Sequence, residues 1–143
     1  MPPSCPRCRL PLRAEAGVDL CDQCGGVWFD RGELEAAIEA APPQGAVPAA
    51  RPEPAVRYLP CPRCTTLMNR KAYERISGVT LDHCNAHGVW LDAGELDRIL
   101  AFEAGDGRER LAIKLTDEAR LDRERQRDAS QRWARIRAGL ESY

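Results

Sequence analysis

Short clusters of apolar residues, separated by glycine and polar positions, recur along the first hundred residues of the chain. The clusters at 10–12 and 18–20 flank a Glu-Ala-Gly segment at 15–17, and a third cluster follows at 27–29. Glycine near the tip of such a segment supplies the positive φ that tight hairpin turns often need. The pattern therefore predicts a hairpin followed by a third short strand.

A second set of apolar clusters follows the same order further along the chain. Positions 67–73 and 79–81 flank Ser77-Gly78, and the third cluster occupies 89–91. After each third strand, apolar residues recur at a spacing of three or four, which is typical of a helix with one buried face. These residues are Leu34, Ile38 and Ala41 in the first set, and Leu96, Ile99 and Leu100 in the second.

An aspartate precedes each predicted helix, and a glutamate follows it three positions later. Asp30 with Glu33, and Asp92 with Glu95, fit an N-cap residue followed by an acidic N3 residue, which is a variant of the capping box. The same carboxylates could be read as a catalytic pair. Capping is the simpler explanation, and we expect these four residues to be structural.

The two sets are copies of one sequence unit. The nine residues at 26–34 return at 88–96 with seven identities, and Cys-Pro-Arg-Cys at 5–8 returns at 61–64. We expect Trp28 and its equivalent Trp90 to cover the hairpins as lids, although an exposed tryptophan also makes a good anchor for a partner. The predicted organisation is a first unit at 1–41, a Pro/Ala-rich linker at 42–57, a second unit at 58–104 and a charged segment at 105–143.

Each copy also contains two pairs of candidate metal ligands. Two residues between the members of a pair let a tight turn direct both side chains at one ion, and two such turns complete a tetrahedron. The gap between the pairs is 19 residues in the second copy, within the usual range for zinc, and a shorter 12 residues in the first. Four soft ligands favour structural Zn²⁺ over an iron–sulfur cluster. The sequence predicts two zinc ions per chain, with the ligands Cys5, Cys8, Cys21, Cys24, Cys61, Cys64, Cys84 and His87.

Other uses of the seven cysteines fit less well. Disulfides would leave one cysteine unpaired and need an oxidising compartment. A thioredoxin-like dithiol opens a helix, whereas strand-like residues follow each Cys-Pro-Arg-Cys here, and the H-x-E motif of zinc deaminases is missing. His83 adjoins Cys84, and neighbouring strand side chains point to opposite faces. We therefore expect His87 to be the ligand and His83 to lie at the surface or beside the site.

Composition narrows the function classes. The 143 residues carry a formal net charge of −1, which argues against a uniformly basic nucleic-acid binder. Copies of about 40 residues are too small to fold on a core alone, so bound metal would supply the missing stability. No apolar run approaches the roughly 18 residues of a membrane span, and the chain starts without a signal-peptide pattern. We expect a cytoplasmic protein that does not bind membranes.

The segment from 105 to 143 is charged and predicted to be helical. Between 106 and 143 it holds ten basic and eight acidic residues, and it contains no proline. Apolar residues recur at three- and four-residue spacing near its end, at Ala129, Trp133, Ile136 and Leu140. No sustained heptad supports a long coiled coil. We expect a solvated helix whose Trp133 end packs on a ribbon or on a second chain; an arginine-bearing helix that touches nucleic acid is the alternative.

These motifs together resemble a known family. Cys-Pro-Arg-Cys, a hairpin and the string C-x-x-C-G-G-V-W-F-D-x-G-E-L resemble the transcription factor IIB-type zinc ribbon of many small prokaryotic proteins. Residues 61–96 look like its variant with three cysteines and one histidine. The resemblance covers about residues 4–41 and 58–104 and implies two zinc ribbons with zinc at the eight named positions. The family takes its name from a transcription factor whose ribbon contacts RNA polymerase, but ribbons serve many partners.

The expected fold is a small metal-stabilised α+β protein. Two zinc ribbons, each of three short antiparallel strands and a short helix, precede a charged C-terminal helix. The expected function is a protein-interaction module with structural zinc, and the alternative is a nucleic-acid-binding or transcription-associated regulator. An enzyme is not expected, because four protein ligands leave zinc no position to activate water, and no small-molecule substrate is implied. Arg7, Arg9 and Arg13, or Arg63, Arg70, Lys71 and Arg75, could form basic edges for nucleic acid.

Overall fold

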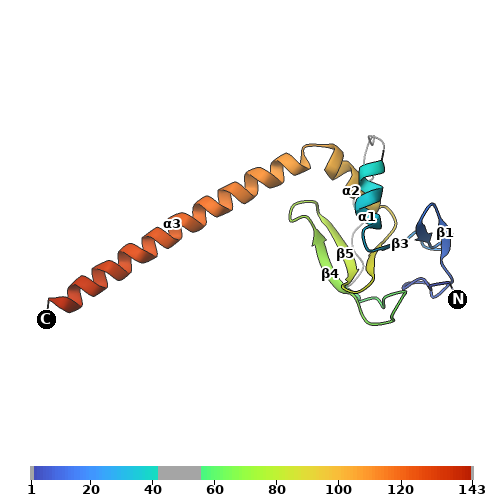
Figure 1. Cartoon of the computed structure of the whole chain (residues 1–143), viewed down its shortest axis with the longest axis horizontal. Helices are drawn as coiled ribbons and strands as arrows, with labels where there is room; N and C mark the ends of the chain where they lie inside the picture. Colours follow the sequence, from blue (N-terminus) through green and yellow to red (C-terminus); the bar gives the residue numbers. More distant parts are fainter. Residues whose placement is uncertain (1, 42–55, 143) are drawn as a thin grey trace. The chain divides into compact units, whose positions relative to one another are not determined.

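A computed structural model describes residues 2–41 and 56–142 of the chain (Figure 1). The chain divides into two compact units, one ending at Gly107 and the other beginning at Arg108. The first unit contains both predicted ribbons. The linker predicted over 42–57 lies outside the described residues, except for Val56 and Arg57.

The first hairpin is shorter than the apolar pattern predicted. Strands β1 (Arg13–Glu15) and β2 (Val18–Leu20) pair around a two-residue turn at Ala16 and Gly17. Both turn residues have positive φ, at 51° and 85°, as a type I′ turn requires. The segment at 10–12, which was predicted as part of the hairpin, contributes an isolated bridge between Pro11 and Ser4.

The remaining elements follow the predicted order. β3 (Val27–Asp30) leads into α1 (Glu33–Ala40). In the second copy, β4 (Asn69–Tyr73), β5 (Val79–Cys84) and β6 (Gly88–Leu91) lead into α2 (Glu95–Ala104). The structure therefore has the small α+β ribbons that the sequence predicted.

The two ribbons share one sheet, which the sequence did not predict. β3 pairs with β6 in antiparallel register, so the six strands run in the order β1-β2-β3-β6-β5-β4. The third strand of each ribbon thus becomes a central strand. The two copies are related across this β3–β6 pairing, with Val27 opposite Leu91 and Asp30 opposite Gly88.

The two faces of the shared sheet carry different cores. Adjacent strand residues point to opposite faces, and consecutive buried aromatics use this alternation. Phe29 packs in one cluster with residues of both helices, including Leu34 and Ile99. Trp28 and Trp90 belong to the other cluster, which contains the metal-ligand cysteines. The sheet therefore separates a helical layer from a layer of cysteine-bearing turns.

The second unit is the helix α3 (Gly107–Glu141), which is 35 residues long. Its polar surface carries ion pairs at helical spacing, such as Arg120 with Glu124 at 3.0 Å and Arg125 with Asp122. Such pairs stabilise an exposed helix by a few tenths of a kcal/mol each. Among the described residues, no helix combines the length and the apolar character that crossing a membrane requires.

Candidate metal centres

The first candidate metal centre brings together Cys5, Cys8, Cys21 and Cys24. Cys5 and Cys8 lie in a turn closed by the hydrogen bond from the Arg9 amide to the Cys5 carbonyl, at 2.9 Å. The second turn repeats this bond from the Gly25 amide to the Cys21 carbonyl, also at 2.9 Å. Each turn therefore directs two sulfurs to one point, and the structure places all four predicted residues together.

The second centre brings together Cys61, Cys64, Cys84 and His87. The Thr65 amide donates to the Cys61 carbonyl at 2.9 Å, which repeats the turn of the first ribbon. His87 presents Nδ1 to the sulfurs of Cys84 and Cys61, at 3.5 Å and 3.8 Å. His83 is not in the cluster; it lies in β5 opposite Val89 and Asn69. The structure thus selects the same histidine that the two-residue spacing favoured.

The distances between the donor atoms suit zinc. Sulfurs about 2.3 Å from a tetrahedral ion lie about 3.8 Å from one another, and a sulfur and a ligating nitrogen about 3.6 Å apart. The sulfurs of Cys5 and Cys24 are 3.7 Å apart, and those of Cys64 and Cys84 are 3.8 Å apart. None of the seven cysteines forms a disulfide. Both donor sets therefore fit a four-coordinate zinc ion.

The thiols of each centre have unlike environments. Burial raises the pKa of Cys5, and it raises the pKa of Cys61 to about 11. A hydrogen bond with the side chain of Thr66 lowers the pKa of Cys64 to about 6. Metal ligation requires the thiolate form of every cysteine. A divalent cation bound there would supply the positive charge that opposes the effect of burial on the thiolates.

Backbone amides also point at the ligand sulfurs. The Cys8 amide donates to the Cys5 sulfur, and the Arg63 amide donates to the Cys61 sulfur, each at 3.3 Å. Hydrogen bonds from amides favour the charged form of a thiol. They also fix each sulfur relative to its turn, so the ligand geometry is built into the local backbone.

Of the predicted capping boxes, the N-cap role of the aspartates is wrong, and the glutamate hydrogen bond is confirmed. Gly32 and Gly94, with φ near 85°, occupy the N-cap positions of α1 and α2, and no side chain caps either helix. Asp30 and Asp92 are therefore not N-cap residues. The glutamate arm of the predicted box is present: the Glu33 carboxylate accepts from the Asp30 amide at 2.8 Å, and that of Glu95 accepts from the Asp92 amide at 2.8 Å.

The aspartate side chains instead bind tryptophan. The Trp28 indole donates to Asp30 at 2.9 Å, and the Trp90 indole donates to Asp92 at 3.1 Å. Both tryptophans are fully buried. Since a buried indole N–H needs an acceptor, each Trp-x-Asp string is a tryptophan with its own acceptor. The two tryptophans are core residues, which rules them out as exposed anchors.

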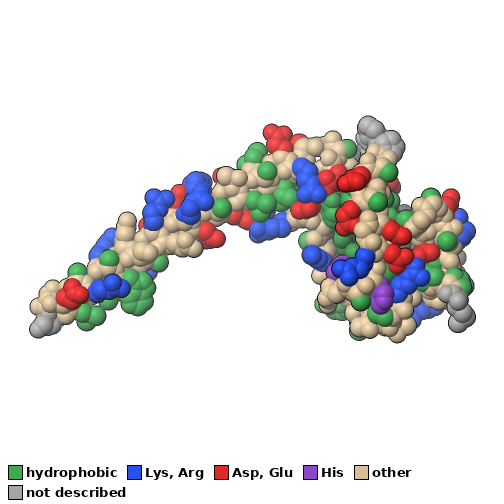
Figure 2. Space-filling model, in the orientation of Figure 1, with side chains coloured by type: hydrophobic (Ala, Val, Ile, Leu, Met, Phe, Trp, Pro, Cys, Tyr) green, Lys and Arg blue, Asp and Glu red, His purple; other side chains and the backbone are tan. Residues whose placement is uncertain are grey.

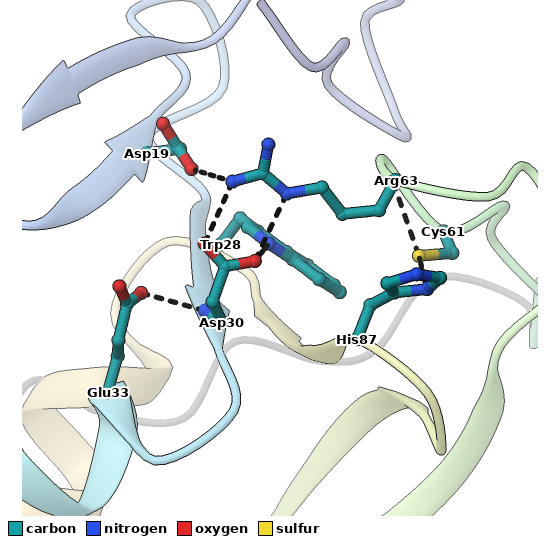
Figure 3. Close-up of polar contacts among 7 residues, drawn as sticks. All are labelled: Asp19, Trp28, Asp30, Glu33, Cys61, Arg63 and His87. Atoms are coloured by element: carbon teal, nitrogen blue, oxygen red, sulfur yellow. Dashed lines mark hydrogen bonds and ion pairs between the residues drawn. The ribbon is translucent and has the colours of Figure 1, made fainter.

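Arg7 and Arg63, which were predicted as possible basic edges for nucleic acid, complete this region. The Arg63 guanidinium donates to Asp30, at 2.8 Å and 3.1 Å, and to Asp19 at 3.1 Å (Figure 3). Arg7 binds Asp92 in the same bidentate way, with one contact of 2.7 Å. Each arginine of a Cys-Pro-Arg-Cys turn thus binds the aspartate of the opposite ribbon. Its identical place in both copies was the signal that could have indicated this role.

These ion pairs shift the ionisation of both partners. The Arg63 guanidinium lowers the pKa of Asp30, and Asp30 in turn raises the pKa of Arg63. The hydrogen bonds with Asp92 raise the pKa of Arg7. The side chains of Arg63 and Asp30 are about one-third exposed, so solvent screens part of their attraction.

Comparison with known proteins agrees with this geometry. A family model described as a transcription factor zinc-finger, the zinc ribbon of transcription factor IIB, matches residues 4–40 and 60–101. No curated protein and no solved structure matches the chain. The two matched segments together cover more than half of the chain, and each contains one of the four-ligand clusters. The chain therefore belongs to the transcription factor IIB-type zinc-ribbon family, of which it carries two copies.

Proposed function

We propose that the chain is a zinc-dependent protein-interaction module, with one structural Zn²⁺ in each ribbon and a partner-binding surface on α3. The donor spacing in both clusters supports zinc. Four protein ligands fill a tetrahedral ion, so neither site offers a position for water or substrate. A role in contact, not catalysis, follows from this closed coordination. Thiolate ligands also favour a reducing compartment, such as the cytoplasm.

An apolar stripe on α3 carries this proposal. It consists of Trp133, Ile136 and Leu140, which are 66%, 46% and 71% exposed. Their spacing of three and four residues places them on one side of the helix. Figure 2 shows hydrophobic side chains at the surface near the C-terminal end of α3, interspersed with arginines. A large exposed tryptophan beside two aliphatic residues is typical of a helix that binds in a groove.

The charges around the stripe indicate the character of the groove. Arg132, Arg135 and Arg137 lie within the same two to three turns as the stripe, and Glu141 is the acidic residue near it. We infer an apolar groove with an acidic rim on a protein partner. Charge complementarity of this kind steers association and selects the partner.

A pull-down from native lysate, quantified across three forms of the full chain, tests the proposal. Trp133→Ala is expected to abolish capture of the dominant partner, because aromatic anchors contribute much of the binding energy of an interface. Leu121→Ala is the matched control, since Leu121 is also an exposed apolar residue of α3, at 45%, but lies outside the stripe. Both variants should retain two zinc ions in native mass spectrometry. Equal capture by all three forms would contradict the proposal.

Nucleic-acid binding is the alternative, and the description of the matching family as a transcription factor zinc-finger favours it. The structure offers less positive charge for phosphate than the sequence suggested. Arg7, Arg63 and Arg13 are engaged with aspartates, Arg13 with Asp22 at 3.0 Å. A mobility shift on mixed DNA and RNA that weakens steeply with salt would support this alternative.

A further inference from the structure

Two arginines, one from each ribbon, bind aspartates of the opposite ribbon. Arg63 belongs to the second ribbon, and its guanidinium binds Asp30 and Asp19 of the first (Figure 3). Arg7 belongs to the first ribbon and binds Asp92 of the second. Bidentate arginine–carboxylate pairs combine energy with a fixed geometry. The contacts are reciprocal, so each ribbon both gives and receives one arginine.

Each crossing arginine is also part of a metal-binding turn. Arg63 lies between Cys61 and Cys64, and its own amide donates to the Cys61 sulfur at 3.3 Å. A metal ion that closes this turn therefore fixes the backbone from which the guanidinium extends. Fixing a side chain in advance reduces the conformational entropy lost when it binds. Zinc in the second ribbon thus favours the contact that Arg63 makes on the first.

The accepting aspartates connect directly to the receiving ribbon's core. Asp30 accepts from the Trp28 indole, and Trp28 packs in the cluster that contains Cys5 and Cys21. In the second ribbon, Asp92 accepts from the Trp90 indole in the same manner. The path from one metal-binding turn therefore runs through hydrogen bonds from arginine to aspartate and from tryptophan to aspartate, and it ends in the buried cluster that contains the ligand cysteines.

The shared backbone adds a second connection. The Arg31 amide of the first ribbon donates at 3.1 Å to the carbonyl of His87, which is a ligand of the second centre. A Cβ atom on Gly26 would lie 2.1 Å from the Trp90 ring, and one on Gly88 would lie 2.0 Å from the Phe29 carbonyl oxygen. Disorder of either central strand would therefore leave one edge of the other without its hydrogen-bonding partner.

We propose that the two metal centres load cooperatively, with Arg7 and Arg63 as the positioning residues that transmit the effect of one ion to the other site. The proposal rests on the zinc occupancy proposed above, but it does not depend on the partner of α3. Metal binding and folding are one equilibrium in small ribbons. Because the first ion orders the arginine that stabilises the opposite ribbon, the second ion binds to a site that is already partly formed.

Native mass spectrometry of the full chain at half-saturating zinc gives the first test. If the two sites bind zinc independently, about half of the molecules or more carry a single ion, whether or not the two affinities are equal. If the affinities are equal and the first ion raises the affinity of the second site about tenfold, the singly loaded fraction falls to about a quarter. We expect the singly loaded form to be depleted in the wild type. In Arg63→Ala, the singly loaded form should increase toward the independent value.

Cobalt titration of the same variants measures the affinity of each site separately. If an arginine affected only the metal site of its own turn, its loss would not change cobalt binding at the opposite site. The four-sulfur and three-sulfur, one-nitrogen sites have different ligand fields, so their visible bands can be followed separately. Arg63→Ala is expected to weaken cobalt binding at the first centre, although Arg63 lies between ligands of the second. Arg7→Ala should weaken binding at the second centre. We expect a loss of about fivefold or more in each case.

Arg13→Ala is the matched control. Arg13 also makes an aspartate ion pair beside the first centre, but with Asp22 of its own ribbon, so this variant should leave the second centre unchanged. Asp30→Asn guards against misfolding of the arginine variants, because it keeps an acceptor for Trp28 and removes one of the two carboxylate charges that Arg63 binds, leaving the pair with Asp19. Arg63→Ala should then cost less in the Asp30→Asn background than in the wild type, because only the pair with Asp19 remains to be lost.

The possible results distinguish failure of the cooperative loading from failure of the zinc assignment. Cross-site weakening with a depleted singly loaded form supports the proposal. Weakening confined to the arginine's own site, or a singly loaded fraction of half or more that no arginine variant changes, overturns it and leaves the zinc assignment intact. A wild-type chain that binds neither zinc nor cobalt overturns both this proposal and the zinc occupancy on which it rests.

Discussion

Trp28 lies directly opposite Trp90 across the β3–β6 pairing, and both side chains are fully buried. Side chains directly opposite each other on paired strands make close contacts. The two equivalent tryptophans of the repeat therefore lie side by side on the central strands of the shared sheet, each with an aspartate accepting from its indole. The two ribbons consequently share the buried cluster on this face of the sheet, so a change in one ribbon at this seam should affect the stability of both.

The first prediction concerns the space between the ribbons. A methyl group on Gly26 would overlap the ring of Trp90, so Gly26→Ala should destabilise the ribbon unit. Overpacking of this kind costs about 1–3 kcal/mol. Thermal unfolding in excess zinc, followed by near-ultraviolet circular dichroism, measures the effect.

Gly139→Ala is the control for this substitution. Gly139 lies in α3 with no atom close to the added methyl group, and alanine is the better helix former by about 1 kcal/mol. The ribbon transition should therefore be unchanged in Gly139→Ala. An unchanged transition in Gly26→Ala as well would mean that the ribbons are not packed as closely as the structure shows.

The ligands and hairpins were predictable because they depend on local spacing. Two residues between cysteines determine a metal-binding turn, and Gly17 and Gly78 mark tight turns wherever they stand. His87 followed from the same spacing. These features need only residues close together in the sequence, which explains why the fold class and both clusters agree with the prediction.

The shared sheet and the crossing arginines were not predictable in this way. Trp28 and Phe29 are consecutive and both buried, which indicates a central strand. The sequence pattern does not show which strand pairs with it. Asp30 could cap a helix or bind Arg63, and the choice depends on a residue more than 30 positions away. Tertiary contacts decided against the local capping motif. The neighbouring Gly32 adopts a left-handed φ and occupies the N-cap position instead.

The second prediction concerns metal removal. The clusters around the metal ligands contain Trp28 and Trp90, so chelation should release both tryptophans together. We expect the near-ultraviolet dichroism of the ribbon unit to disappear in excess chelator and to return when zinc is added, because binding supplies the folding free energy of small zinc domains. A native near-ultraviolet spectrum in a verified metal-free sample would contradict the assignment of structural zinc.

The third prediction concerns backbone strain in a metal-binding turn. Thr65 has φ of 62°, in the left-handed region that costs an L-residue about 1–2 kcal/mol and suits glycine. Thr65→Gly should therefore stabilise the ribbon unit by up to about 1 kcal/mol. The loss of the hydrogen bond from the Thr65 hydroxyl to the Cys64 carbonyl offsets part of this gain. Chemical denaturation in excess zinc measures the change.

Thr80→Gly serves as the matched control, since Thr80 lies within β5 opposite Ala72 and no positive φ favours glycine there. Glycine in a strand interior weakens the strand. The two substitutions should therefore change stability in opposite directions. Loss of stability in both would show that the turn at Thr65 carries no strain that glycine relieves.

The last prediction concerns pH and the buried carboxyl group of Glu95. Glu95 is 7% exposed, and burial raises its pKa from 4.5 to about 7, with Asp92 and Asp82 nearby and Arg98 opposing the shift. Between these two values the folded chain binds more protons than the unfolded chain. The contribution of this group to stability therefore falls as pH rises from about 4.5 to about 7, and then levels off.

Glu95→Gln removes this dependence and keeps an oxygen that can accept from the Asp92 amide. The free energy of unfolding of the variant minus that of the wild type should therefore increase from pH 5.5 to pH 7.5, measured by denaturation in excess zinc. Zinc release at acidic pH affects both proteins and cancels in the difference. Glu35→Gln, on the exposed side of α1, controls for the loss of one negative charge. Only a group whose pKa differs between the folded and unfolded chains changes stability with pH. Parallel curves of the free energy of unfolding against pH for wild type and Glu95→Gln would therefore show that burial does not shift the pKa of Glu95.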